Sequence, residues 1–167
     1  MSPTRSRFAF RPALLVALGA ALVAASPMPA ASLDSARVTR GEFSAFASGA
    51  GQAITGHADM VRSPSGTTFV TIHVQGLVPG GQYASHVHKA ACATGSADGH
   101  FKQDPVGASA PPNEIWLGGG PFAADGGGVA NARVTVDYIA NDDAVSVVVH
   151  DLSLPSTVNK IACAGLG

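Results

Sequence analysis

Two histidines separated by one residue, His86 and His88, are the side chains in this sequence whose types and spacing most directly suggest chemistry. They follow a Pro-Gly-Gly turn at residues 79–81, which predicts a strand over 82–88. Because side chains alternate between the two faces of a strand, both imidazoles are expected on one side, with Val87 on the other. Two imidazoles on a rigid face form half of a metal site. The pair alone is equally compatible with an exposed polar strand.

Four of the six histidines could together complete such a site. Besides His86 and His88, His100 lies in a long loop and His150 ends a predicted strand. Imidazole suits copper, zinc, iron and nickel, and an all-nitrogen set favours copper(II). Thiolate zinc sites are excluded because paired cysteines are absent, and a blue-copper site is excluded because no methionine follows Cys163. The sequence also contains no nucleophile elbow and no phosphate-binding glycine loop.

Short strands are the elements expected to position these histidines. Alternation of apolar and polar residues predicts strands over 52–62, 67–75, 128–138 and 144–150. His57 and His73 fall on the polar faces of the first two strands and are expected to be ordinary surface side chains. Residues 90–130 have almost no periodicity, and a loop of that length inside a compact domain is usually functional. It contains the single tryptophan, Trp116, which is expected to anchor the loop by packing. The pattern predicts an antiparallel sandwich or barrel.

The first 31 residues have the layout of a secretory signal peptide. Three arginines precede an apolar run from Ala13 to Ala25, and small residues follow it up to Ala31. The run is too short to anchor the chain in a membrane. We therefore expect an exported protein, periplasmic or extracellular, without a membrane anchor after cleavage. Residues 32–50 are expected to be a flexible lead-in with at most a short strand near 43–46, and residues 51–167 to form a single domain.

Composition disfavours nucleic acid as a partner and predicts one disulfide. Without the predicted signal peptide, lysine plus arginine falls from 10 to 7 against 11 acids, so the net charge is about −4. A weakly acidic surface is not that of a nucleic-acid-binding protein. Cys92 and Cys163, the only cysteines, are expected to pair because an exported chain folds in an oxidising compartment. Two free buried thiols are the alternative, and the sequence leaves the oligomeric state open.

Several short motifs follow one another along the chain. They are Gly76-Leu77-x-Pro79-Gly80, Ser85-His86-Val87-His88, Gly99-His100-Phe101, Asp125-Gly126-Gly127-Gly128-Val129-Ala130, Val147-Val148-Val149-His150 and Ile161-Ala162-Cys163-Ala164-Gly165. In order and rough spacing they resemble those of the copper-zinc superoxide dismutases. The resemblance runs from about Gln52 to the carboxyl end. It implies an all-β fold, namely a Greek-key eight-stranded β-barrel or flattened sandwich with long connecting loops.

The same resemblance implies roles for particular residues. His86, His88, His100 and His150 correspond to ligands of one copper per chain, with His100 at the position that bridges copper to zinc in members with both metals. Cys92 and Cys163 correspond to the family's disulfide.

Three departures make the chain similar to the copper-only branch of that family. No histidine lies between Phe101 and Val149, and the family's zinc aspartate segment falls on residues 115–118, so zinc binding is not expected. Only 12 residues separate His150 from Cys163, too few for the family's charged loop that guides superoxide. The family's active-site arginine is replaced by Lys160, which keeps the positive charge but loses the two-pronged donor geometry.

The expected function is that of an exported copper-dependent superoxide dismutase, an oxidoreductase that converts superoxide to oxygen and hydrogen peroxide. His100 is expected to take up a proton and Lys160 to attract the anion. Glu114 is the leading candidate for a carboxylate that fixes the His100 ring, and Asp104 is the second. Two alternatives remain: a copper-binding or copper-buffering protein without significant turnover, and a non-catalytic domain that retains the scaffold.

Overall fold

The computed structural model describes residues 34–167. The predicted signal peptide, residues 1–31, lies outside the described residues. Among residues 34–167 no helix is long and apolar enough to cross a membrane. The described elements, in chain order, are β1 (Arg37–Ala45), η1 (Ala47–Gly49), β2 (Thr55–Arg62), β3 (Thr68–Gln75), β4 (Gln82–His88), η2 (Leu117–Gly119), β5 (Phe122–Ala123), β6 (Ala130–Val136), β7 (Ser146–Asp151) and β8 (Lys160–Gly165).

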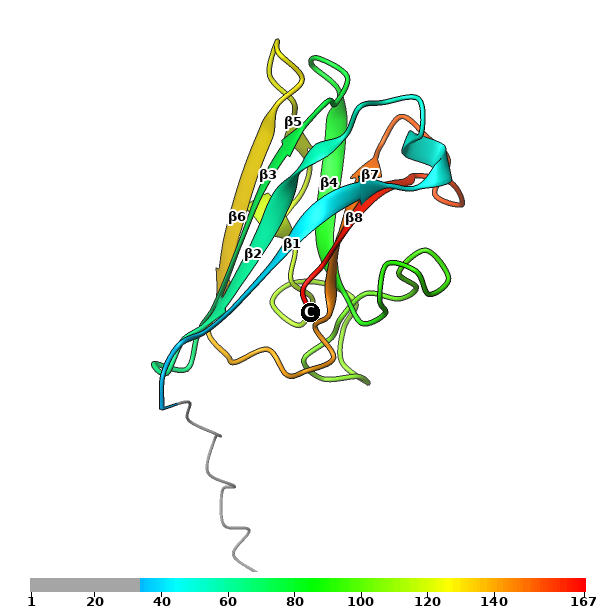
Figure 1. The fold of residues 1–167 in the computed structure, drawn as a ribbon. Coiled ribbons are helices and arrows are strands. Elements are labelled where there is room, and N and C mark those ends of the chain that lie inside the picture. Colours follow the sequence, from blue (N-terminus) through cyan, green and yellow to red (C-terminus); the bar gives the residue numbers. More distant parts are fainter. Residues whose placement is uncertain (1–33) are drawn as a thin grey trace, which may run out of the picture. The chain divides into compact units, whose positions relative to one another are not determined.

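The eight strands form a nearly closed antiparallel barrel in the order β5-β4-β7-β8-β1-β2-β3-β6, which confirms the predicted fold class. Two groups of strands can be followed in Figure 1: β1, β2, β3 and β6 on one side, and β4, β7 and β8 on the other. Because β5 pairs with β4, the chain crosses between the groups three times: from β3 to β4, from β5 to β6 and from β6 to β7. The neighbours β3–β6 and β4–β7 are therefore far apart in sequence.

The apolar residues predicted by alternation fill the space between the two groups. Met60 on β2, Val70 and Val74 on β3, and Val87 on β4 are each 0% exposed, as is Val147 on β7. Burial of this shared core is the main contribution to fold stability. It also fixes which side of each strand faces outward, and therefore where the polar side chains lie.

The strand β1 is longer than the sequence predicts. The lead-in, residues 32–50, was expected to be flexible with a short strand near 43–46, but β1 extends over Arg37–Ala45 and pairs with both β2 and β8. Only Gly41 and Phe43 of this strand are buried, so the segment has no apolar alternation. Its backbone ladder, rather than side-chain burial, holds it in the barrel. Gly41 lies where β1 changes partner, and any side chain there would collide with the Gly165 backbone.

The long segment from Lys89 to Gly120 lies outside the strand ladder, as expected from its lack of periodicity. It runs close to β4 through two isolated bridges, His86 with Trp116 and His88 with His100. These bridges bring loop residues alongside the two strand histidines. The loop is therefore the element that brings the third histidine to the pair on β4.

Candidate metal centre

The structure brings the four predicted histidines together. Nitrogen atoms of His86, His88, His100 and His150, one from each ring, lie within 4.8 Å of one another. The shortest separation of ring centroids is 4.4 Å, between His86 and His100, and the longest is 6.4 Å, between His86 and His88. His86 and His88 share one side of β4 while Val87 packs in the core, as the strand alternation predicts.

Hydrogen bonds fix the tautomer of three of the rings. His88 Nδ1 donates to the Ala97 carbonyl at 2.6 Å. His100 Nδ1 donates to the Glu114 carboxylate at 2.8 Å, and His150 Nδ1 donates to the Asn159 side-chain oxygen at 3.1 Å. Because these oxygens only accept, each Nδ1 carries the proton and each neutral ring keeps its lone pair on Nε2.

His86 differs from the other three rings. Its Nδ1 atom is buried and has no hydrogen-bond partner. A buried polar atom without a partner costs free energy, and such atoms are rare in native proteins. The ring atoms available to a cation are therefore Nδ1 of His86, which lacks a partner, and Nε2 of the other three.

Two of these lone pairs face each other. His88 Nε2 lies 3.4 Å from His150 Nε2, and neither carries a proton in the tautomer just described. Burial and the nearby His100 lower the pKa of His88 to about 2, and burial lowers the pKa of His86 to about 3 and that of His150 to about 4. These three rings are therefore neutral near pH 7, and a cation is the species that can relieve the opposed lone pairs of His88 and His150.

Glu114 is placed to hold the His100 ring. Its side chain is only 3% exposed, and its Oε2 atom accepts from His100 Nδ1 and from Trp116 Nε1, both at 2.8 Å. Asp104, the second candidate, is exposed and accepts from the Val106 backbone at 3.0 Å, so it belongs to its own turn. The structure thus places Glu114 beside His100 and leaves Asp104 outside the cluster.

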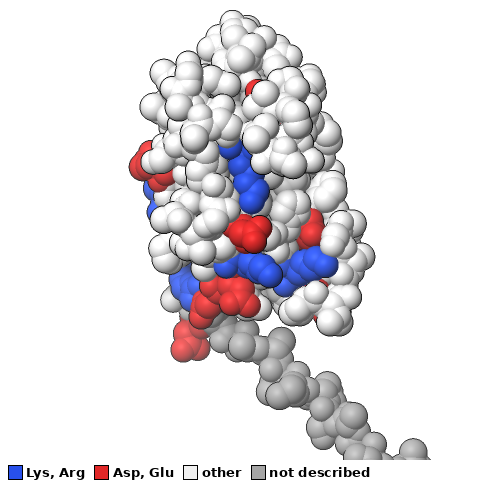
Figure 2. All heavy atoms as spheres, turned by 90° about the vertical axis from the view of Figure 1, so that its right-hand side faces the viewer, with Lys and Arg blue, Asp and Glu red and all other residues white. Residues whose placement is uncertain are grey.

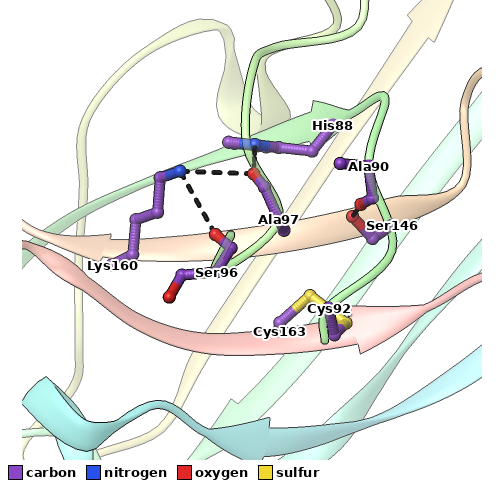
Figure 3. Close-up of a disulfide and its surroundings, with 8 residues drawn as sticks. All are labelled: His88, Ala90, Cys92, Ser96, Ala97, Ser146, Lys160 and Cys163. Carbon is purple, nitrogen blue, oxygen red and sulfur yellow. Dashed lines mark hydrogen bonds between the residues drawn. A yellow bond between two sulfur atoms is a disulfide. The ribbon is translucent and has the colours of Figure 1, made fainter. Parts of the chain in front are cut away.

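Lys160 lies at the mouth of the cluster. Its Nζ atom donates to the Ser96 and Ala97 carbonyls, each at 3.2 Å (Figure 3). It also lines an open pocket of about 280 Å³ together with His86, His100 and His150. A positive charge therefore stands at the solvent side of the cluster.

The predicted disulfide is present and lies under the same loop. Cys92 and Cys163 are bonded (Figure 3). Cys163 packs with Ala97 and Val148. Ala97 supplies the carbonyl that fixes His88. The disulfide therefore ties the loop that orients one ring to the strand β8 that carries Lys160.

Three parts of the site were not identified from the sequence. Trp116 was expected to be a packing anchor only, yet it hydrogen-bonds Glu114 and its ring centroid lies 5.0 Å from that of His86. Its spacing of two residues from Glu114 was the available signal. The Asn159 side chain and the Ala97 carbonyl carry no sequence signal, because a backbone oxygen has no residue type and one asparagine has many roles. His57 and His73 lie outside the cluster.

No protein-family model matches the sequence, and no curated protein sequence matches it. Solved structures similar to this chain include three forms of superoxide dismutase 5 from Candida albicans: a Cu(II) form and two mutant forms. Their sequence identities to this chain are 17%, 18% and 17%, and the TM-scores are 0.47, 0.48 and 0.49. The matches cover 76%, 76% and 78% of this chain and 88%, 86% and 90% of theirs. This chain therefore resembles superoxide dismutase structures at low sequence identity.

Proposed function

We propose that the protein is an exported copper-dependent superoxide dismutase whose centre is the four-histidine cluster. One observation carries the metal assignment: the lone pairs of His88 Nε2 and His150 Nε2, on two buried rings, oppose each other at 3.4 Å. An all-imidazole set with no thiolate suits copper in both of its common oxidation states. The N-terminal pattern and the disulfide support export to an oxidising compartment.

Four nitrogen atoms would hold the copper ion: Nδ1 of His86 and Nε2 of His88, His100 and His150. The orphaned Nδ1 of His86 fits this assignment, because a bound cation would give it the partner it lacks. Bound copper would supply one-electron chemistry, taking an electron from one superoxide ion and giving one to a second. The residues of the chain must then attract the anion, hold the rings and deliver protons.

Lys160 is the residue that we assign to the anion. Its ammonium group lines the pocket that opens on His86, His100 and His150. On the face in Figure 2, lysines and arginines lie next to acidic side chains, and much of that face is uncharged. Among the described residues that line this pocket, Lys160 is the one lysine and none is an arginine, aspartate or glutamate, so its charge has a large share in the field at the pocket mouth.

His100 is the ring that we assign to proton transfer. Its side chain is 32% exposed, whereas those of His88 and His150 are buried, and it lines two pockets. Glu114 holds the ring through Nδ1, so Nε2, whenever it does not bind the ion, could take or release a proton without the ring turning away. Each pair of superoxide ions consumes two protons, and His100 is positioned to pass them.

A copper-binding protein without turnover is the competing function. Lys160 already donates to two carbonyls, and this engagement favours a structural role for it. Such a protein would bind copper at the same four histidines but would not consume superoxide catalytically. Activity measured on the same sample as metal content separates the two functions.

The test loads the mature, oxidised protein with copper and zinc together and removes loosely held metal by gel filtration. We expect about one retained copper per chain and catalytic consumption of superoxide, with both lost in His150→Ala and both kept in Asp104→Asn. Retained copper without consumption would replace the enzyme with the binding protein. No retained copper in a folded sample would overturn the metal centre.

A further inference from the structure

The outer face of β1, β2, β3 and β6 carries a second group of histidines that the proposed function does not use. His57 on β2 and His73 on β3 are register partners, and their ring centroids lie 5.7 Å apart. Both rings are partly exposed on the side of the sheet opposite the core. Directly opposite neighbours in an antiparallel pair are held by the backbone ladder, so this proximity does not depend on side-chain packing.

The row extends across all four strands. Glu42 on β1 is the register partner of His57, and Asn131 on β6 is the register partner of His73. The four strands therefore present, side by side, a carboxylate, two imidazoles and an amide. The same strands can be followed in Figure 1 as the group β1, β2, β3 and β6.

The hydrogen bonds of His73 resemble those of a metal-ligating ring. Its Nδ1 atom lies 2.8 Å from the Asn131 side-chain oxygen, which only accepts, so Nδ1 carries the proton. Its Nε2 lone pair accepts from the exposed Gln75 amide at 2.7 Å. Ligating histidines are oriented by an oxygen acceptor on one ring nitrogen, as Asn131 orients His73, and they bind the ion through the other nitrogen, which Gln75 occupies here.

A carboxylate stands next to the other ring. His57 Nε2 lies 3.5 Å from Asp59 Oδ2. Two ligands bound tetrahedrally to one zinc ion at about 2.05 Å are about 3.3 Å apart, so this spacing already approaches that of a shared ion. Arg40 contacts the same carboxylate at 3.3 Å and opposes a cation there, which limits the affinity.

We propose that His57, His73 and Asp59 form a second, exposed binding site for a divalent cation of the zinc and copper(II) class. Imidazole with carboxylate is a ligand set that zinc accepts, and the open side of the site leaves room for water. Because it lies on the outer face of β2 and β3, the site loads from solvent independently of the four-histidine cluster. It is weaker than a buried site, since Gln75 must leave His73 Nε2 for the ion to bind.

The test uses the mature protein already exposed to copper and freed of loosely held metal, and titrates it with Zn²⁺ by calorimetry. We expect one further equivalent, and zinc-induced shifts of the His57 and His73 ring signals in NMR spectra. His73→Gln should weaken this event at least about tenfold, because losing a ligand costs no less than losing the group that orients one.

Two neighbouring amides provide matched variants. Asn131→Ala should weaken zinc binding about tenfold or more, because the His73 ring loses its acceptor. Gln75→Ala should leave the affinity unchanged or raise it, because the competing donor is gone. Equal effects of both variants would indicate nonspecific surface binding and overturn the proposal. Zinc shifts confined to other histidines, or an unchanged affinity in His73→Gln, would also overturn it.

Discussion

A single carbonyl oxygen, that of Ala97, links the proposed anion-attracting residue to a proposed metal ligand. It accepts from His88 Nδ1 at 2.6 Å and from Lys160 Nζ at 3.2 Å. The shared acceptor holds the lysine ammonium near the cluster, and it keeps the His88 lone pair on Nε2. Lys160 can therefore act on the substrate by charge or on the metal through the loop, and the two roles predict different results.

Replacing Lys160 by glutamine is expected to slow superoxide consumption about two- to tenfold at low ionic strength, with copper content unchanged. The difference from the wild-type rate should shrink in high salt, because salt screens the lost charge. Stopped-flow rates across a range of salt concentrations measure this. Arg133→Gln, which removes a charge on β6, should leave the rate unchanged. A lower copper affinity with no change in salt dependence would show that Lys160 acts only on the loop.

Replacing Glu114 by glutamine is expected to weaken copper binding about 10- to 100-fold, because the carboxylate that fixes His100 loses its charge. Glutamine retains one oxygen acceptor for the donors His100 Nδ1 and Trp116 Nε1, so the fold should be kept. Competition with a chelator measures the affinity, and the emission of Trp116, the only tryptophan, reports on local structure. Asp104→Asn is the control and should match the wild type. Unchanged affinity and activity in Glu114→Gln would remove this residue from the mechanism.

The element that most needs support is the loop between β4 and His100. Ser96 and Ala97 have φ values of 57° and 54°, a left-handed conformation that costs residues other than glycine of the order of 1 kcal/mol each. The carbonyls of these two residues are the acceptors for Lys160 and His88. The bond between Cys92 and Cys163 fixes the start of this loop to β8. The disulfide therefore supports ring orientation as well as overall stability.

Removing the disulfide with Cys92→Ser and Cys163→Ser is expected to lower the free energy of unfolding by up to roughly 4 kcal/mol in the chain-entropy model. Copper affinity should fall as well, even at temperatures where the variant is folded, because Ala97 is less well placed. Denaturant unfolding and chelator competition measure the two effects. Met60→Ala provides a control: it is 0% exposed on β2, costs about 2–5 kcal/mol, and lies away from the cluster. Equal copper affinity in both variants would limit the disulfide to stability.

The alternation of apolar and polar residues along the sequence predicted the strands whose buried and exposed residues alternate. It failed where backbone pairing between distant segments, rather than side-chain burial, holds a strand in place. β3, with Val70, Ile72 and Val74 buried, has a clear period of two. β1 has no such period because its ladder with β2 and β8 holds it, and pairing partners are not visible in a local window. The four histidines were chosen as candidates by residue type and by the resemblance to the dismutases, and Glu114 by its carboxylate. Asn159 and the Ala97 carbonyl were not, because their roles arise from contacts between distant segments.

At the scale of the whole molecule, the two tyrosines connect the barrel to its loops. The Tyr83 hydroxyl accepts from the Val78 backbone at 2.9 Å, and the Tyr138 hydroxyl donates to the Pro112 carbonyl at 2.9 Å. Burial raises the pKa of Tyr83, and burial raises the pKa of Tyr138 to about 12. Both phenols therefore stay protonated in the folded chain at a pH where free tyrosine ionises.

This difference predicts alkaline destabilisation of the entire domain. Between pH 10 and about 12 the unfolded chain releases the Tyr138 proton while the folded chain keeps it, so the unfolded state binds fewer protons and the free energy of unfolding falls as pH rises. Absorbance at the phenolate band and denaturant unfolding at several pH values measure this. Tyr138→Phe should be less stable than the wild type near pH 8, because it loses the bond to Pro112, but should show a shallower decline above pH 10. A parallel decline in both proteins would mean that the Tyr138 pKa is the same in the folded and the unfolded chain, and it would overturn this prediction.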